Sequence, residues 1–417
     1  MNLAKPAEQL SNSYKRPSTE YNKHPNKKST VLRNIAAYII LLVICAIIFT
    51  PLISTLSLNG GDYKLHLKWA SDMESSHTLN LPHPLYHILV IIAKKLLTID
   101  YTQSSTVVTV IFIYFLAILN LKILASHTSL AIAIFLSTCL LIVTPIQLFY
   151  FIDHHLYFGY IGISIYHSPT MLLLKPLSLL VFCCALKSVN SQTNKAWPGG
   201  VALALSLFFC GISKPNFLIV VLPAFVAFLL ITNRLKNMLS HTYIYVWFFL
   251  PILTLLSLQF LQTFILQDIS KVTNDSENHI TIMPFETLAH YSEFLLAKLF
   301  LSIAFPLTIL LLYPKQFIKD DSIILSSCCL FVGALFMYFF AESGSRIYHG
   351  NFWWSGQIGL YLVFLFSVAF LLRNKKDLKE TKQGKIKYSL CFAMFFLHAA
   401  FGVFFYKQEL FFNSKFW

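Results

Sequence analysis

Long apolar runs separated by short polar segments repeat along almost the whole chain. A helix of about 20 apolar residues crosses the ~30 Å hydrocarbon core of a bilayer with all its backbone polar groups bonded internally. The pattern therefore predicts an all-α polytopic membrane protein with about eleven transmembrane helices, at residues 32–58, 105–124, 129–150, 171–186, 199–212, 217–231, 243–266, 291–313, 323–340, 356–372 and 388–406.

The composition agrees with this class of protein. Only 12% of the residues are charged and the mean hydropathy is +0.65, whereas soluble domains carry about 25% charged residues. The net charge of +14 would suggest a nucleic-acid partner in a soluble protein. Here the basic residues cluster between apolar runs, so we interpret them as a topology signal and expect membrane lipids as neighbours and no nucleic-acid partner. The eight cysteines all lie within apolar runs, which indicates packing rather than disulfides.

The chain divides into a basic tail, a membrane domain and a short end. Residues 1–31 are polar and basic and predict a disordered cytoplasmic tail. Residues 32–406 form the transmembrane domain, which includes an extracytoplasmic loop at 59–102, and residues 407–417 form a short extracytoplasmic tail. Within the loop, the apolar stretch 84–97 would be a helix of only ~21 Å, too short to span, so it is predicted to lie at the interface.

Charge asymmetry sets the predicted orientation. Lysine and arginine concentrate in alternate loops, which are predicted to face the cytoplasm, whereas most acids and histidines fall in the other loops. The sequence thus predicts a cytoplasmic N-terminus and an extracytoplasmic C-terminus in a bacterial inner membrane. Any chemistry is expected on the extracytoplasmic face.

The first outer loop holds the strongest catalytic candidate. Asp62 follows a double glycine, and its spacing to His66 places both on one helical face. A partly desolvated carboxylate could act as a general base toward an acceptor hydroxyl or amine, or Asp62 could simply cap a helix. His83 and His87 could contact phosphate or acceptor, or belong to an interfacial aromatic belt.

Further polar groups are expected on the same face. Asp153, His154 and His155 could contact a pyrophosphate or a sugar, and Asp153 and His154 are candidates for a divalent cation; surface polarity is the alternative. Lys175 and Lys214 each lie in or beside an apolar run and precede a proline. A lysine at membrane depth needs an acidic partner such as a lipid phosphate, unless its amine reaches the interface.

The short loop at 341–354 carries the remaining candidates. Arg346 offers a planar fork for phosphate oxygens, or it could pair with Glu342 and cap two helices. His349 and Asn351 are further predicted substrate contacts, and the tryptophans at 353 and 354 could stack on a sugar ring.

These motifs resemble the GT-C superfamily of integral membrane glycosyltransferases, which includes the lipid A aminoarabinose transferases and protein O-mannosyltransferases. Asp62 matches the acidic residue near the start of that family's first outer loop. His83-Pro84-Leu85-Tyr86-His87 is similar to its proline–aromatic signature, with His83 in place of the first proline, and Ser213-Lys214-Pro215 resembles its lysine-containing turn. The resemblance implies a polyprenyl-phosphate-sugar donor, inverting transfer and Asp62 as catalytic base.

The sequence thus favours transfer of a sugar from a polyprenyl-phosphate donor to an envelope lipid, glycan or protein. A polysaccharide polymerase or ligase, which also handles lipid-linked sugars, is an alternative within enzymes. A lipid-linked sugar flippase or transporter is the alternative from another class, although no internal repeat is seen.

Overall fold

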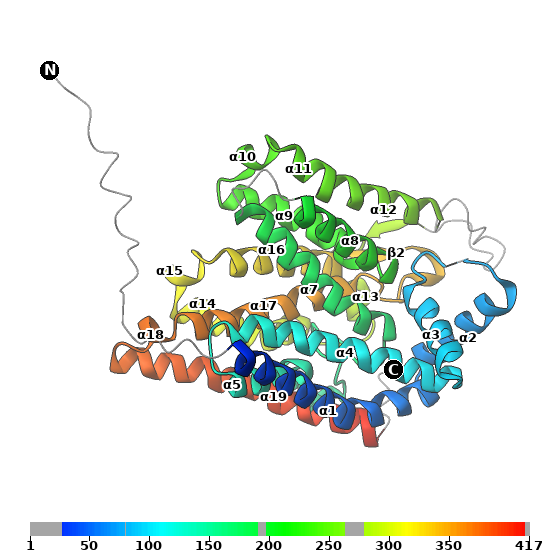
Figure 1. The fold of residues 1–417 in the computed structure, drawn as a ribbon, viewed down its shortest axis with the longest axis horizontal. Coiled ribbons are helices and arrows are strands. Elements are labelled where there is room, and N and C mark those ends of the chain that lie inside the picture. The colour runs from blue at the N-terminus through cyan, green and yellow to red at the C-terminus, as the bar shows by residue number, and fades with distance from the viewer. Residues whose placement is uncertain (1–26, 80, 191–196, 263–278, 413–417) are drawn as a thin grey trace.

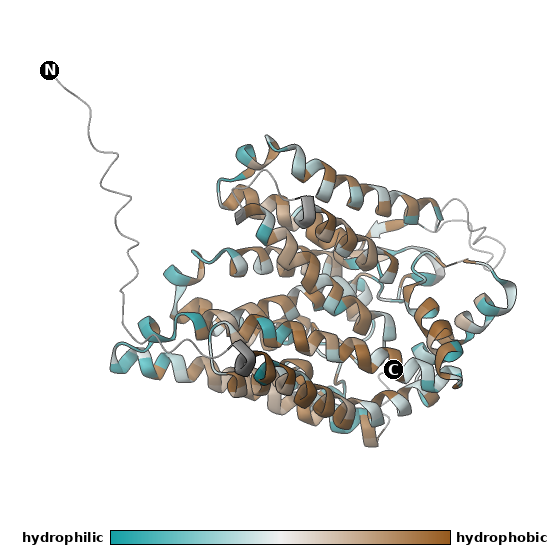
Figure 2. Cartoon of the chain, viewed as in Figure 1, coloured by the Kyte–Doolittle hydropathy of each residue, from teal (hydrophilic) through white to brown (hydrophobic). Residues whose placement is uncertain are grey.

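The computed structural model describes residues 27–79, 81–190, 197–262 and 279–412 as a layered bundle of long helices (Figure 1). Within these ranges, eight helical segments are long and apolar enough to cross a membrane. They are α1 (Lys27–Asn59), α4 (Tyr101–Ala125), α7 (Pro169–Asn190), the continuous α11 (Thr242–Ile244), η1 (Tyr245–Phe249) and α12 (Leu250–Phe260), α14 (Leu295–Leu312), α16 (Asp321–Phe339), α17 (Trp353–Arg373) and α19 (Lys382–Phe411). Apolar residues predominate in the middle of the long helices, and polar residues are more frequent at their ends (Figure 2).

Three shorter apolar helices occupy the other predicted spans. They are α5 (Leu130–Ile142), α8 (Trp197–Ser213) and α9 (Asn216–Ile231). The all-α polytopic class is confirmed, whereas the number of eleven transmembrane helices stays a prediction.

The predicted span at 129–150 differs from the structure, in which α5 ends at Ile142. Pro145 disfavours helical backbone in the residue before it and provides no N–H for a helix. The extended backbone that follows is bonded to other helices: Thr144 N–H donates to His398 O, His398 Nδ1 to Thr144 O (2.6 Å), and Ile146 N–H to Leu301 O. Tertiary partners in α19 and α14 therefore replace the missing helical turns.

The two ends of the bundle differ in their small elements. At one end lie α2 (Gly61–Ser76) and α3 (Leu85–Leu97), with α13 (Glu286–Ala289) nearby; at the other lie α10 (Leu235–Leu239), α15 (Pro314–Phe317) and α18 (Lys375–Leu378) (Figure 1). The three helices of the second end carry basic residues in their last turns. This separation fits the predicted charge asymmetry, while the orientation in a membrane stays a prediction.

Short elements connect the helices at the end that contains α2 and α3. Strand β1 (Ile280–Ile282) pairs antiparallel with β2 (Phe340–Glu342), which continues α16. Two further short helices are α6 (Tyr150–Asp153) and η4 (Gly344–Arg346).

The predicted terminal boundaries also shift. Helix α1 begins at Lys27, and most of the predicted tail at 1–31 lies outside the described residues. Helix α19 begins at Lys382 and continues to Phe411, so the predicted tail at 407–417 begins as helix.

Helix α17 is the centre of the bundle, since every residue from Trp353 to Leu372 is buried. It packs closely against α16 through small residues. A Cβ on Gly359 would lie 2.6 Å from Leu330 Cα, and one on Gly356 would lie 3.0 Å from Met337 Sδ. Small residues at such contacts let two helix backbones approach, which is how helices associate in membranes.

We expect Gly359→Leu to separate α16 from α17, because its new side chain would meet backbone atoms that cannot move aside. Overpacking of this kind costs about 1–3 kcal/mol or more. The thermal unfolding midpoint of the purified protein in detergent should therefore fall. Phe331 lies on α16 and is 66% exposed, so the control variant Phe331→Leu should keep a midpoint near the wild-type value. Equal midpoints for both variants would contradict the close approach.

Candidate functional site

The α2–α3 hairpin is fixed to the bundle by buried hydroxyl groups. Tyr86, at the start of α3, donates to Ser105 Oγ in α4 (2.7 Å), and Ser105 is 2.9 Å from Ser57 Oγ in α1. Helix α3 has 13 residues, in agreement with the predicted short helix. The candidate residues of the hairpin are therefore carried on helices that are hydrogen-bonded to the bundle.

Glu74 holds the same two helices together. Its carboxylate pairs with Lys94 (2.8 Å) and Lys95 (3.5 Å) and accepts a hydrogen bond from the Tyr101 hydroxyl. The hydrogen bonds from Lys94 and Tyr101 lower the pKa of Glu74 to about 2. Glu74 of α2 thus stabilises the contact of α2 with α3 and with the start of α4.

Asp62 has no such engagement. It lies in the first turn of α2, where Gly60 occupies the capping position and no side chain caps the helix. Within the part of the chain that the structure describes, its carboxylate takes part in no hydrogen bond or ion pair. Asp62 therefore does not cap α2 through its side chain, as the alternative interpretation expected. Its negative charge is still favourable at the helix N-terminus.

His66 and His87 form a buried pair between α2 and α3. His66 Nδ1 lies 3.0 Å from His87 Nε2, and the side chains are 8% and 1% exposed. Burial lowers the pKa of His87 to about 4 and that of His66 well below its usual range, with smaller effects of His87, Lys214 and His83 on His66. Both rings are neutral at pH 7, so one donates the shared proton and the other accepts it.

Lys214 occupies the turn between α8 and α9 and faces the hairpin. Its Nζ lies 4.2 Å from the ring centre of Trp354, at the start of α17. Burial lowers the pKa of Lys214 to about 8, and the charge of Asp62 acts in the opposite direction. Burial, followed by the charge of Lys214, lowers the pKa of His83 to about 3. Lys214 is thus close enough to interact electrostatically with Asp62, His66 and His83.

The loop between α16 and α17 joins this cluster through α9. Asn216, two residues after Lys214, donates to Asn351 O (2.8 Å), and Asn351 Nδ2 donates to Glu342 Oε2 (3.0 Å). Arg346 Nε pairs with the same carboxylate at 3.1 Å, which is the ion-pair alternative expected from the sequence. His349 is exposed, and its backbone N–H donates to Arg346 O (3.0 Å).

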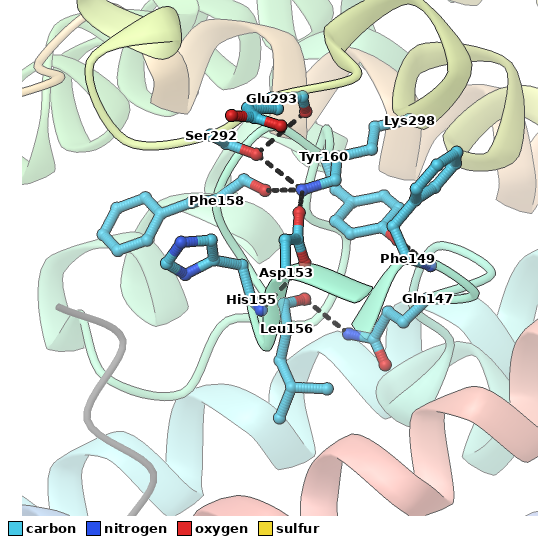
Figure 3. Close-up of polar contacts among 10 residues, drawn as sticks. All are labelled: Gln147, Phe149, Asp153, His155, Leu156, Phe158, Tyr160, Ser292, Glu293 and Lys298. Atoms are coloured by element: carbon cyan, nitrogen blue, oxygen red, sulfur yellow. Dashed lines mark hydrogen bonds and ion pairs between the residues drawn. The ribbon is translucent and has the colours of Figure 1, made fainter. Parts of the chain in front are cut away.

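The residues from 153 to 155 form a separate group (Figure 3). Asp153 pairs with the buried Lys298 of α14 and accepts a hydrogen bond from His155 N–H (3.0 Å). His154 is exposed. No group of three or more His, Cys, Asp or Glu side chains suited to a metal occurs among the described residues; the divalent cation at Asp153 and His154 stays a prediction.

Lys175 lies inside the bundle in α7. Its side chain is 4% exposed, and Nζ donates to Ile163 O. It also lines a small cavity with Phe49, Tyr166 and Tyr361. The amine of Lys175 therefore bonds to a backbone carbonyl instead of the acidic partner expected from the sequence.

Two residues of the site were missed by the sequence analysis. His167 and Tyr157 come from the loop before α7, and the charge of Asp62 acts on the pKa of both. Their rings meet edge to face at 4.9 Å, and His167 lies 6.1 Å from the Trp354 ring. The only local signal was a loop without lysine or arginine, which does not single out either residue.

No family model matches the chain, and no curated protein is similar to it in sequence. The resemblance to GT-C glycosyltransferases therefore stays a hypothesis that rests on the residues themselves.

We expect Asp62→Asn to make Lys214 more reactive toward acylating reagents, because the carboxylate charge raises the pKa of Lys214. A larger neutral amine fraction at pH 7.5 should raise its labelling rate about twofold, as measured by peptide mass spectrometry. Asp72→Asn, a control on the same helix, should leave the rate unchanged. An unchanged rate in Asp62→Asn would mean that the two groups are not neighbours.

Proposed function

We propose that this chain is a glycosyltransferase of the bacterial inner membrane that takes a sugar from a polyprenyl-phosphate donor. The acceptor is an envelope lipid, glycan or protein on the extracytoplasmic face. The observation that carries the proposal is the carboxylate of Asp62, which has no hydrogen bond or ion pair with the described residues. It lies within electrostatic reach of Lys214, at the end of the bundle opposite the basic helices.

Asp62 is the proposed general base. As an acceptor O–H or N–H attacks the anomeric carbon, the carboxylate takes its proton, and the bond from that carbon to the phosphate oxygen breaks. The polyprenyl phosphate leaves with the electron pair of that bond, and a single displacement inverts the configuration. A carboxylate that accepts no hydrogen bond from the described residues keeps its lone pairs available for this proton.

Lys214 is the proposed contact for the departing phosphate. The charge of Asp62 acts on its ionisation, and a polyprenyl chain could extend along the lipid-facing helices beside it. The neutral histidines provide neutral hydrogen-bonding groups around the sugar and phosphate. Arg346 pairs with Glu342 through Nε only, so its two terminal nitrogens remain available for phosphate oxygens.

Asp62→Asn should lower sugar transfer from a polyprenyl-phosphate sugar by about 10²-fold or more, the usual contribution of general base catalysis. Transfer is measured with purified enzyme in lipid vesicles. Asp72→Asn is the matched control and should retain wild-type transfer. If Asp62→Asn transfers sugar at the wild-type rate, Asp62 is not the general base. If the wild-type protein transfers sugar from no polyprenyl-phosphate donor, the protein is not a glycosyltransferase of this class.

Binding of farnesyl phosphate should weaken as the pH rises through about 8, because Lys214 then loses its charge. The phosphate monoester is already a dianion above its second pKa of about 6, so the change belongs to the protein. Affinity at pH 9 should be about tenfold below that at pH 7, as measured by titration in nanodiscs. Lys214→Arg stays charged and should bind equally at both pH values; the same fall in that variant would exclude Lys214 as the source.

A further inference from the structure

Lys298 is a buried cation at the end of the bundle that contains the candidate site. Its side chain is 0% exposed, and its Nζ contacts three acceptors: the Asp153 carboxylate, Ser292 Oγ (2.5 Å) and Phe158 O (3.2 Å) (Figure 3). An ammonium group has three N–H donors, so all of them are used. We call Asp153, Phe158, Ser292 and Lys298 the loop clamp.

The loop clamp fastens the loop before α7 to α14. Gly159 has a φ of +82°, and a Cβ there would lie 2.5 Å from Ser292 Oγ and 2.8 Å from Lys298 Cδ, so only glycine permits this approach. One turn further along α14, Ser302 Oγ accepts from Ile161 N–H (3.0 Å) and donates to Lys298 O (2.7 Å). The loop is thus held at several successive residues.

The clamped loop forms one side of the candidate site. Phe158 stacks on Tyr291 with ring centres 4.7 Å apart. Tyr157, the residue before Phe158, accepts a hydrogen bond from Gln357 of α17 (2.7 Å), and its ring contacts the ring of His167. His167 in turn lies beside Trp354, the residue over which Lys214 is placed. A continuous set of contacts therefore leads from Lys298 to Lys214.

Stability alone does not account for a buried ion pair here. The desolvation of two charges offsets most of their attraction, and well-packed apolar residues often serve a core equally well. The Lys298 ammonium makes three directional hydrogen bonds, which apolar packing does not provide, and these bonds fix the position of the loop.

We propose that Asp153 and Lys298 are positioning residues that hold Tyr157 against His167, and through it His167 against Trp354, and so shape the binding site around Lys214. The pair itself touches no substrate. Its effect on phosphate binding rests on the proposed function, whereas its effect on the loop does not.

The test separates loop position from overall stability with three variants. Lys298→Met leaves Asp153 partly exposed to water, whereas Asp153→Asn leaves a buried lysine without its counter-ion, so the second should unfold more easily. The double variant Asp153→Asn/Lys298→Met contains neither charge and should regain thermal stability without regaining the directed hydrogen bonds. Arg373→Met, which breaks the ion pair with Asp320 at the other end of the bundle, is the matched control.

Two readouts are taken on full-length protein in nanodiscs. Hydrogen–deuterium exchange should rise in peptides covering residues 154–168 in Lys298→Met and in the double variant, and remain at the wild-type level there in Arg373→Met. Farnesyl phosphate should bind the two clamp variants about tenfold more weakly, within the roughly hundredfold range that a 1 Å misplacement can cost, and the control variant with wild-type affinity.

Each outcome decides one part of the proposal. Unchanged exchange at 154–168 in the double variant would overturn the positioning role. Increased exchange with wild-type affinity would overturn the connection to Lys214. If the wild-type protein does not bind farnesyl phosphate, the proposed function fails, and the exchange result alone decides the role of the clamp.

Discussion

The close backbone contact between α16 and α17 is the constraint on which the rest of the bundle depends. Glycines at 356 and 359 allow it, and α17 is then enclosed along its whole length. At one end the contact places Trp354 beside the α8–α9 turn, under Lys214. At the other, Arg373 meets Asp320 at the start of α16. The geometry of the candidate site therefore follows from a packing contact in the core.

Three carboxylates at the site end form ion pairs with lysine or arginine side chains. Glu74 holds two lysines, Glu342 pairs with Arg346, and Asp153 with Lys298. Such pairs satisfy groups that would be costly to leave unpaired in a low-dielectric surrounding. Asp62 differs from the other three carboxylates, because its charge acts on Lys214 without a hydrogen bond or ion pair within the described ranges. Its place beside Lys214, together with this lack of a bonded partner among the described residues, is the basis for proposing it as the base.

The sequence alone predicted the position of some of these residues but not the partners of others. The short helix predicted at 84–97 and the placing of Lys214 at a turn followed from apolar length and from proline. Adjacency in the chain grouped Asp153 with His154 and His155 as neighbours in a chemical site. The structure instead joins Asp153 to Lys298, which is 145 residues away. Local spacing says which residues share a face, and it contains no information about a partner so distant in the chain.

The sequence by itself determined that this is an all-α membrane protein with polar groups concentrated between its apolar runs, because hydrocarbon requires helices whose backbones bond internally. Only the tertiary structure decided where α5 ends, because the carbonyl groups and N–H groups after Ile142 are bonded by α14 and α19. It also decided which charged side chains form ion pairs with one another. Those outcomes depend on contacts between distant helices, and the energies of such contacts are absent from any local pattern of residues.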